Sequence, residues 1–243
     1  MDVFNAEEWQ KKISDPQWYM AVPGLLKQMY ALHDTDRVAY ENTKEQIYSF
    51  FEQALKDGTI ALSTTGKNFD AERKPIDTVV IHHTSIEAGI TKDRISAIDL
   101  VRLYAPQYAD PSSVADKDIR GDAVYSGHFR DGKQVFWPYH WIIRAGGVCE
   151  RLLNDEEIGW QAGNWDVNCR SVGIVFDNDY EHSIPADEEL RTLAKLIREK
   201  YPQVKRENII GHCEVNKKTC CPSHLFLSKD GKVGWKEKLI NMI

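Results

Sequence analysis

The sequence predicts a mixed α/β domain preceded by a helical region. The β-branched run Thr78–Ile81 is typical of a buried strand and is followed directly by two histidines. Residues 186–201 carry a stripe of apolar side chains at helical spacing, with acidic residues in the first turn and basic residues in the last. Strands that alternate with helices along one stretch of chain indicate a mixed sheet with helices packed on it.

Composition narrows the class of protein further. The chain has 243 residues, of which 42% are hydrophobic and 10% aromatic, and this excludes a disordered chain. A charged fraction of 28% and the lack of any apolar run of about 20 residues predict no membrane span. The net charge of −6 argues against a nucleic-acid partner, because binding phosphates requires clustered Lys and Arg.

The chain is expected to divide at two places. Residues 1–58 are predicted to be a helical accessory region, in which the segment from about Asp36 to Lys56 has apolar residues at i, i+3, i+4 and i+7 and Gly58 supplies a stop signal. Residues 59–75 are predicted to be a linker, and residues 76–243 the α/β domain. An earlier helical stretch is expected to break near Pro23.

Several further elements are expected within the α/β domain. Gly146 and Gly147 predict a hairpin turn between two strands. The remaining expected elements, in chain order, are a helix over 92–104, an irregular insertion over 105–130, strands over 139–143, 148–152 and 171–176, and a short strand over 208–210.

Residue types that bind metals lie at the ends of these predicted strands. They are the pair His82 and His83, then His212, and then Cys221 nine residues further on. A catalytic zinc ion takes three protein ligands and an open fourth position, and two imidazoles with one thiolate form a suitable set. Such an ion polarises a carbonyl and lowers the pKa of its bound water to about 7. The spacing alone leaves open that these histidines are unrelated.

Six motifs, in this order, make the chain resemble one enzyme family. It is similar to the zinc-dependent N-acetylmuramoyl-L-alanine amidases of the peptidoglycan-recognition-protein and phage-lysozyme-like superfamily over roughly residues 76–226. The matching motifs are VVIHHT at 79–84, YHWII at 139–143, GWQAGNW at 159–165, NCRSVGI at 168–174, GHCEV at 211–215 and TCCP at 219–222.

The resemblance implies a fold, a metal and its ligands. The fold would be a mixed, twisted β-sheet flanked by helices, like that of the peptidoglycan recognition proteins, with residues 1–58 as an extension. Zn²⁺ would be bound by His82, His212 and Cys221. Neighbouring residues of a strand point to opposite faces, so only one of His82 and His83 can face the metal. We expect His83 and Cys220 to be structural.

The resemblance also implies catalytic and substrate-binding residues. Tyr139 would orient the attacking water or assist proton transfer, and Thr219 would donate a hydrogen bond to the oxyanion. The alternative for Tyr139 is a half-buried strand aromatic. The residues expected to line the substrate groove are Trp160, Asn164, Trp165 and Asn168, with core packing as the alternative for either Trp.

Two positions depart from the family pattern. Many relatives have a histidine where this chain has Gln161, and some amidases have a glutamate where it has Val175. An apolar side chain cannot act as a general base, so that role would fall on Tyr139. The histidines without a family role are expected to be ordinary surface or loop residues: His33, His128, His182 and His224. Cys149 and Cys169 are expected to be free thiols.

The resemblance implies hydrolysis of the amide between N-acetylmuramic acid and L-alanine, in peptidoglycan or in released muropeptides. Two alternatives stay open: a non-catalytic peptidoglycan-binding protein on the same fold, and an interaction protein whose zinc is structural. The first residues, MDVFNAEEWQKK, lack the order of a signal peptide. We therefore expect a cytoplasmic monomer, or one that is released or exported to the cell wall by another route.

Overall fold

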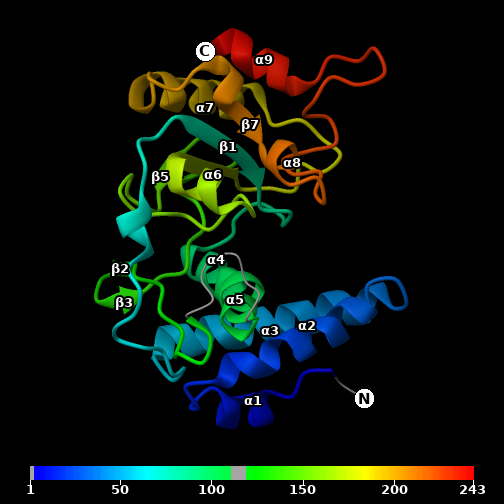
Figure 1. The fold of residues 1–243 in the computed structure, drawn as a ribbon. Coiled ribbons are helices and arrows are strands. Elements are labelled where there is room, and N and C mark those ends of the chain that lie inside the picture. Colours follow the sequence, from blue (N-terminus) through cyan, green and yellow to red (C-terminus); the bar gives the residue numbers. More distant parts are fainter. Residues whose placement is uncertain (1–2, 111–118) are drawn as a thin grey trace. The chain divides into compact units, whose positions relative to one another are not determined.

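The structure is a computed structural model that describes residues 3–110 and 119–243. The chain forms two compact units (Figure 1). Unit 1 comprises Met1–Asn68 and Thr91–Phe136, and unit 2 comprises Phe69–Ile90 and Trp137–Ile243. The expected insertion at 105–130 therefore lies in the same unit as the N-terminal helices, and its residues 111–118 lie outside the described part of the chain. The predicted domain boundaries at residues 58 and 75 stay a prediction.

Unit 1 is mainly helical. Its longest helix, α3 (Arg37–Asp57), begins where the Asp36 carboxylate accepts a hydrogen bond from the Ala39 amide and ends at Gly58, whose φ of +66° suits a residue without Cβ. The other elements are α1 (Ala6–Lys12), a 3-10 helix (Trp18–Ala21), α2 (Val22–Ala31), α4 (Lys92–Asp99), a π-helical turn (Leu100–Tyr104), α5 (Ala105–Ala109), β2 (Phe129–Arg130) and β3 (Lys133–Gln134).

Aromatic side chains form much of the core of unit 1. Phe51 of α3 packs against Trp9 and Trp18, with ring centroids 5.6 and 5.4 Å apart. Tyr19 contacts Tyr108 of α5 at 5.7 Å. Helices α3 and α4 also contact each other extensively. Residues 91–110 are thus part of one hydrophobic core with the N-terminal helices.

Unit 2 is built on a five-stranded sheet of order β5-β4-β6-β1-β7. The strands β4, β6, β1 and β7 run parallel to one another, and β5 is an edge strand antiparallel to β4. Both central strands, β1 and β6, are fully buried, as parallel strands with covered faces should be. The bounds are β1 (Thr78–His83), β4 (Trp141–Ile143), β5 (Cys149–Arg151), β6 (Ser171–Phe176) and β7 (Ile209–Gly211).

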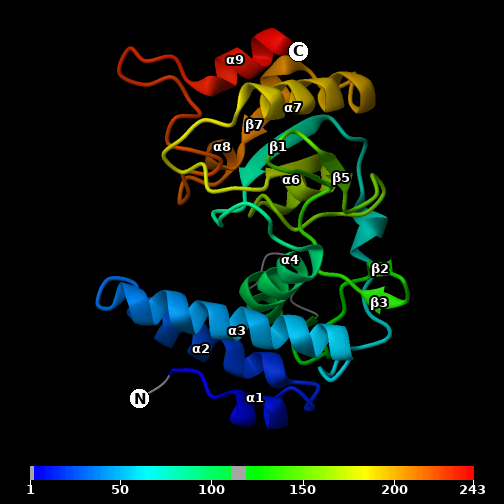
Figure 2. The same ribbon diagram turned by 180° about the vertical axis from the view of Figure 1, so that it is seen from behind.

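Helices cover both faces of this sheet. Val79 and Ile81 of β1 belong to the large core that includes α7 (Asp187–Lys200) and α9 (Trp235–Met242), whereas Val80 packs with α6 (Trp165–Arg170). Figures 1 and 2 show α7 and α9 next to each other on one side of the sheet. The short helix α8 (His212–Val215) follows β7, and 3-10 turns lie at Phe69–Glu72 and Arg206–Asn208.

The predicted fold class, a mixed sheet flanked by helices with N-terminal helices before it, is confirmed. Three expectations differ in detail. The strand expected from residue 139 begins at Trp141, the helix expected over 92–104 continues as helical turns to Ala109, and Pro23 lies in the first turn of α2 instead of breaking it. Proline fits there because the first helical amides have no intrahelical partner.

Candidate metal centre

Strand register brings the two predicted histidine ligands together. Strand β1 pairs in parallel with β7, and Ile81 is opposite Gly211. His82 and His212 are each the next residue, so they leave the same edge of the sheet side by side although 130 positions separate them. Their ring centroids are 4.9 Å apart. The carboxyl ends of parallel strands are where open α/β sheets place their sites.

The alternation of side chains along β1 selects His82 over His83. His82 lies on the same face as Val80, toward α6, and His83 lies on the opposite face. There the Nδ1 atom of His83 accepts the backbone N–H of Tyr180 at 3.0 Å, and its Nε2 atom is 3.0 Å from the Ser85 hydroxyl. Both ring nitrogens of His83 are therefore engaged in unit 2 and neither faces His212.

A short loop returns Cys221 to this edge. The amide of Cys213 donates to the Cys221 carbonyl at 2.7 Å, and the Cys221 amide donates to the Thr219 hydroxyl oxygen at 3.1 Å. The peptide bond between Cys221 and Pro222 is cis. Gly211 allows Pro222 to approach the end of β7 closely, because a Cβ on residue 211 would lie 2.7 Å from Cδ of Pro222.

The three side chains place their donor atoms around one point. One ring nitrogen of His82, one of His212 and the sulfur of Cys221 all lie within 4.8 Å of one another. The Nδ1 atom of His82 is 3.7 Å from the sulfur. Zn–N and Zn–S distances of about 2.1 and 2.3 Å at a tetrahedral angle separate two donors by about 3.6 Å. The spacing therefore fits a tetrahedral zinc ion.

The chemistry of the donors fits a cation as well. Burial, together with the nearby His212, holds the pKa of His82 well below its usual range, and burial lowers the pKa of His212 to about 4. Both imidazoles are thus neutral at neutral pH and have lone pairs to offer. Burial raises the pKa of the Cys221 thiol to about 12, and a bound cation would reverse that shift. The Nε2 atom of His212 is buried without a hydrogen-bond partner, a costly state.

Gln161 orients His82, a role that the sequence does not predict. The Nε2 atom of His82 lies 2.5 Å from Oε1 of Gln161, whose amide nitrogen donates to the Ser171 hydroxyl at 2.9 Å. An amide oxygen can only accept, so the proton of His82 is on Nε2 and Nδ1 is free toward Cys221. The sequence marks this position, because Gln161 replaces the histidine that many family members have there. The replacement puts a hydrogen-bond acceptor beside His82.

Two more residues of interest surround His82. The ring of Tyr139 is 4.9 Å from the ring of His82 and is half-buried. Val175 of β6 is the register partner of His82 and is fully buried. The position at which some amidases have a glutamate therefore adjoins the first histidine, and here it offers no proton acceptor. A Cβ on Gly173 would be 3.4 Å from the Tyr139 ring and 2.9 Å from Gln161, so this glycine makes room for both.

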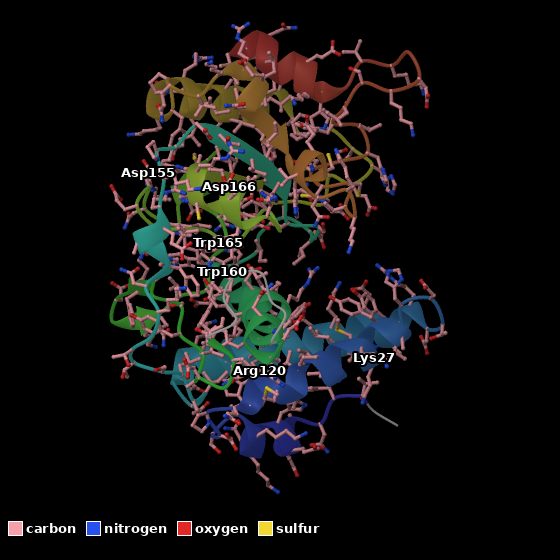
Figure 3. All side chains as sticks on the ribbon, in the orientation of Figure 1. Lys27, Arg120, Asp155, Trp160, Trp165 and Asp166 are labelled. Carbon is pink, nitrogen blue, oxygen red and sulfur yellow. The ribbon has the colours of Figure 1, made fainter. Side chains whose placement is uncertain are left out.

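The four residues expected to line a substrate groove lie at and before α6. Trp160 and Trp165, labelled in Figure 3, have ring centroids 6.0 Å apart. Trp160 is buried and Trp165 is half-buried, with its indole N–H donated to Glu72 at 2.7 Å. Asn164 caps α6, and the buried Asn168 accepts the amide of Ala162 at 2.8 Å. These contacts are local packing and capping, and a substrate role for the four residues stays a prediction.

The donor group has three members among the described residues. The residues that a closed structural zinc site would need as a fourth ligand, His83, Cys213 and Cys220, do not join it. All five cysteines are free thiols, as expected for Cys149 and Cys169. Three protein donors with an open fourth position are typical of catalytic zinc sites. Fold and site together define a mixed α/β protein with three candidate metal donors at the carboxyl edge of its parallel strands.

A comparison with sequence models of protein families shows the family of this chain. The model described as N-acetylmuramoyl-L-alanine amidase matches residues 72–224, so the chain belongs to this family. A search of curated proteins finds no match. No helix in the described part of the chain is long and apolar enough to cross a membrane.

Several solved structures are similar to the chain. The endolysin N-acetylmuramoyl-L-alanine amidase LysCS from Clostridium intestinale URNW is 20% identical, with 67% of this chain and 83% of that chain covered and a TM-score of 0.40. Drosophila peptidoglycan recognition protein SD is 20% identical, with 67% and 83% covered and a TM-score of 0.41. AmpD is 18% identical, with 74% and 92% covered and a TM-score of 0.42.

Proposed function

We propose that the chain is a zinc-dependent amidase that hydrolyses the amide between the lactyl group of N-acetylmuramic acid and L-alanine of a peptidoglycan stem peptide. The observation that carries the proposal is the convergence of His82, His212 and Cys221 in a chain of the amidase family. Zn²⁺ held by these residues would polarise the scissile carbonyl and lower the pKa of a water at its open position.

The side chains around the centre would each have a distinct task. Gln161 holds the tautomer of His82 that presents Nδ1. Tyr139, beside His82, would orient the attacking water and transfer its proton, because Val175 leaves no carboxylate at the neighbouring position. Thr219 accepts the Cys221 amide, which leaves its hydroxyl proton available to donate to the oxyanion of the tetrahedral intermediate.

The direct test uses defined muropeptides, metal-free and zinc-loaded protein, and mass spectrometry of the products. We expect zinc-loaded protein to release the intact stem peptide from N-acetylmuramic acid and expect a chelator to abolish release. His82→Ala and His212→Ala should each lose both zinc and hydrolysis. Zinc content by elemental mass spectrometry and folding by circular dichroism give readouts that do not depend on activity.

Two results would contradict the proposal. Hydrolysis that persists in the zinc-free His82→Ala protein would remove the centre from the reaction. Tight muropeptide binding by zinc-loaded protein without cleavage would instead identify a binding protein on the amidase fold.

A further inference from the structure

A second group of metal-binding side chains lies on the surface of unit 2, and the proposed reaction uses none of these side chains. Glu181 and His182 follow β6, and His224 lies three residues beyond Cys221. One donor atom from each of these three residues lies within 4.8 Å of the others. We propose that Glu181, His182 and His224 form a second, exchangeable site for a divalent transition-metal ion such as Zn²⁺.

Backbone hydrogen bonds fix the two loops against each other. The amide of His224 donates to the Glu181 carbonyl at 2.9 Å. The Ser223 hydroxyl, which is 3% exposed, lies 3.3 Å from the same carbonyl and 3.1 Å from the Ser183 carbonyl. The donor residues are therefore held by buried polar contacts on both loops, and their convergence does not depend on surface side chains alone.

The three side chains also contact one another in pairs. The rings of His182 and His224 stack with centroids 5.1 Å apart and an angle of 18° between their planes. The Nε2 atom of His224 is 3.6 Å from Oε1 of Glu181, and the Cys220 thiol donates to the same oxygen at 3.6 Å. An exposed ion pair would account for Glu181 and His224 but gives no reason for His182 to join them.

The chemistry of the three donors selects the ion. Two imidazoles and one carboxylate suit Zn²⁺, Cu²⁺ and Ni²⁺, whereas Ca²⁺ and Mg²⁺ prefer oxygen ligands only. Both histidines are exposed, so solvent can complete the coordination and the ion can exchange. An ion at this position would join the loop after β6 to the loop that carries Cys221, and it would stabilise the folded chain by binding only that state.

The test is a count of bound Zn²⁺ by equilibrium dialysis, with elemental analysis of wild type and variants across a range of free Zn²⁺. We expect His182→Ala and His224→Ala each to bind one equivalent fewer than wild type. The matched control is His33→Ala, which removes another exposed histidine that contacts one carboxylate, Asp34, at 2.6 Å, but that belongs to no three-donor group among the described residues. This control should bind as many equivalents as wild type.

The outcomes separate this site from the buried centre. Because the count compares each variant with wild type, the expected difference of one equivalent is the same whether or not His82 binds zinc. All variants are at exposed positions, and circular dichroism verifies their folding. As a second readout, added Zn²⁺ should raise the thermal midpoint of wild type and of His33→Ala more than that of His224→Ala. Equal equivalents and equal midpoint shifts in wild type and His224→Ala would overturn the proposal.

Discussion

At the scale of single residues, the proposed zinc ligand His82 is held by a side chain that is not itself a proposed ligand. Gln161 accepts from Nε2 of His82 and is in turn held by the Ser171 hydroxyl. Outer contacts of this kind fix the ring orientation and raise the basicity of a metal-bound histidine. A glutamine does this here without adding a negative charge to the buried centre.

We therefore expect Gln161→Met to weaken Zn²⁺ binding by about 10–100-fold, since it keeps the volume and removes the acceptor. Competition against a chromogenic chelator measures this change. Gln161→Glu is the matched control, because its carboxylate can still accept from His82 and the Ser171 hydroxyl can donate to it. If Gln161→Met bound zinc as tightly as wild type, the hydrogen bond to His82 would have no part in metal binding.

Tyr139 allows a test of the reaction that leaves the metal in place. We expect Tyr139→Phe to lower turnover of a defined muropeptide by about 10²–10⁴-fold, the usual contribution of a general acid or base, with zinc content unchanged. The phenyl ring keeps the contact with the ring of His82, so the substitution removes only the hydroxyl. Turnover at the wild-type rate would show that Tyr139 is a packing residue.

The sequence predicts these residues unequally well. His82, His212 and Cys221 are predicted through family motifs, and the parallel register of β1 and β7 explains why residues so far apart in the chain meet. Gln161 departs visibly from the family pattern, but its role escapes prediction because its contact with His82 forms only in the folded chain. Glu181 and His224 escape for the same reason, since their loops meet only through the fold.

At the scale of elements, sequence pattern predicts those whose signals are local. Strand β6 is found at its predicted bounds, and α7 lies within one residue of them. Asp36 and Gly58 mark the ends of α3 with a side-chain cap and a positive φ. Sequence pattern does not predict the helices α6 and α9, because six and eight residues are too few for a periodic pattern and tertiary packing stabilises them.

The contact between α3 and α4 includes a largely buried carboxylate, that of Glu52. Glu52 of α3 accepts from Arg94 at 2.6 Å and from Lys56 at 2.8 Å, and it is 9% exposed. Burial raises the pKa of the Glu52 carboxyl, but Lys56 and Arg94 outweigh this and hold it below 4.5. A lowered pKa stabilises the fold fully above pH 4.5, and the stabilisation is lost as the pH falls through the folded value.

Glu52→Gln should therefore lower the free energy of unfolding by about 2 kcal/mol at pH 7, the range for hydrogen bonds to charged groups. The difference from wild type should shrink as the pH falls below 4.5. Urea titrations at a series of pH values test both statements. Glu45→Gln is the control, because Glu45 binds the same Arg94 at 3.0 Å from an exposed position and should change stability by less than about 1 kcal/mol. A pH-independent loss in Glu52→Gln would refute the electrostatic explanation.

At the scale of the whole molecule, each compact unit is built from two separate stretches of the chain. The family match runs through residues 72–224 without interruption, yet Thr91–Phe136 form one compact unit with Met1–Asn68. No local pattern in residues 91–110 reveals this partner, because the packing surfaces of α4 and α3 become complementary only in three dimensions. The helical extension and the insertion are therefore two parts of one core.

This organisation makes a prediction about truncation. Deletion of residues 1–58 removes α1 to α3, which contact α4 and α5, and it removes Tyr19, which packs on the buried Tyr108 of α5. Each large apolar side chain so exposed costs about 1.5–3 kcal/mol, and a continuous apolar patch promotes aggregation. We expect the truncated chain to be insoluble or to bind a hydrophobic dye strongly, and expect co-expression of residues 1–58 to restore solubility. A truncated chain that is monomeric and unfolds cooperatively would instead show that residues 1–58 are a separate module.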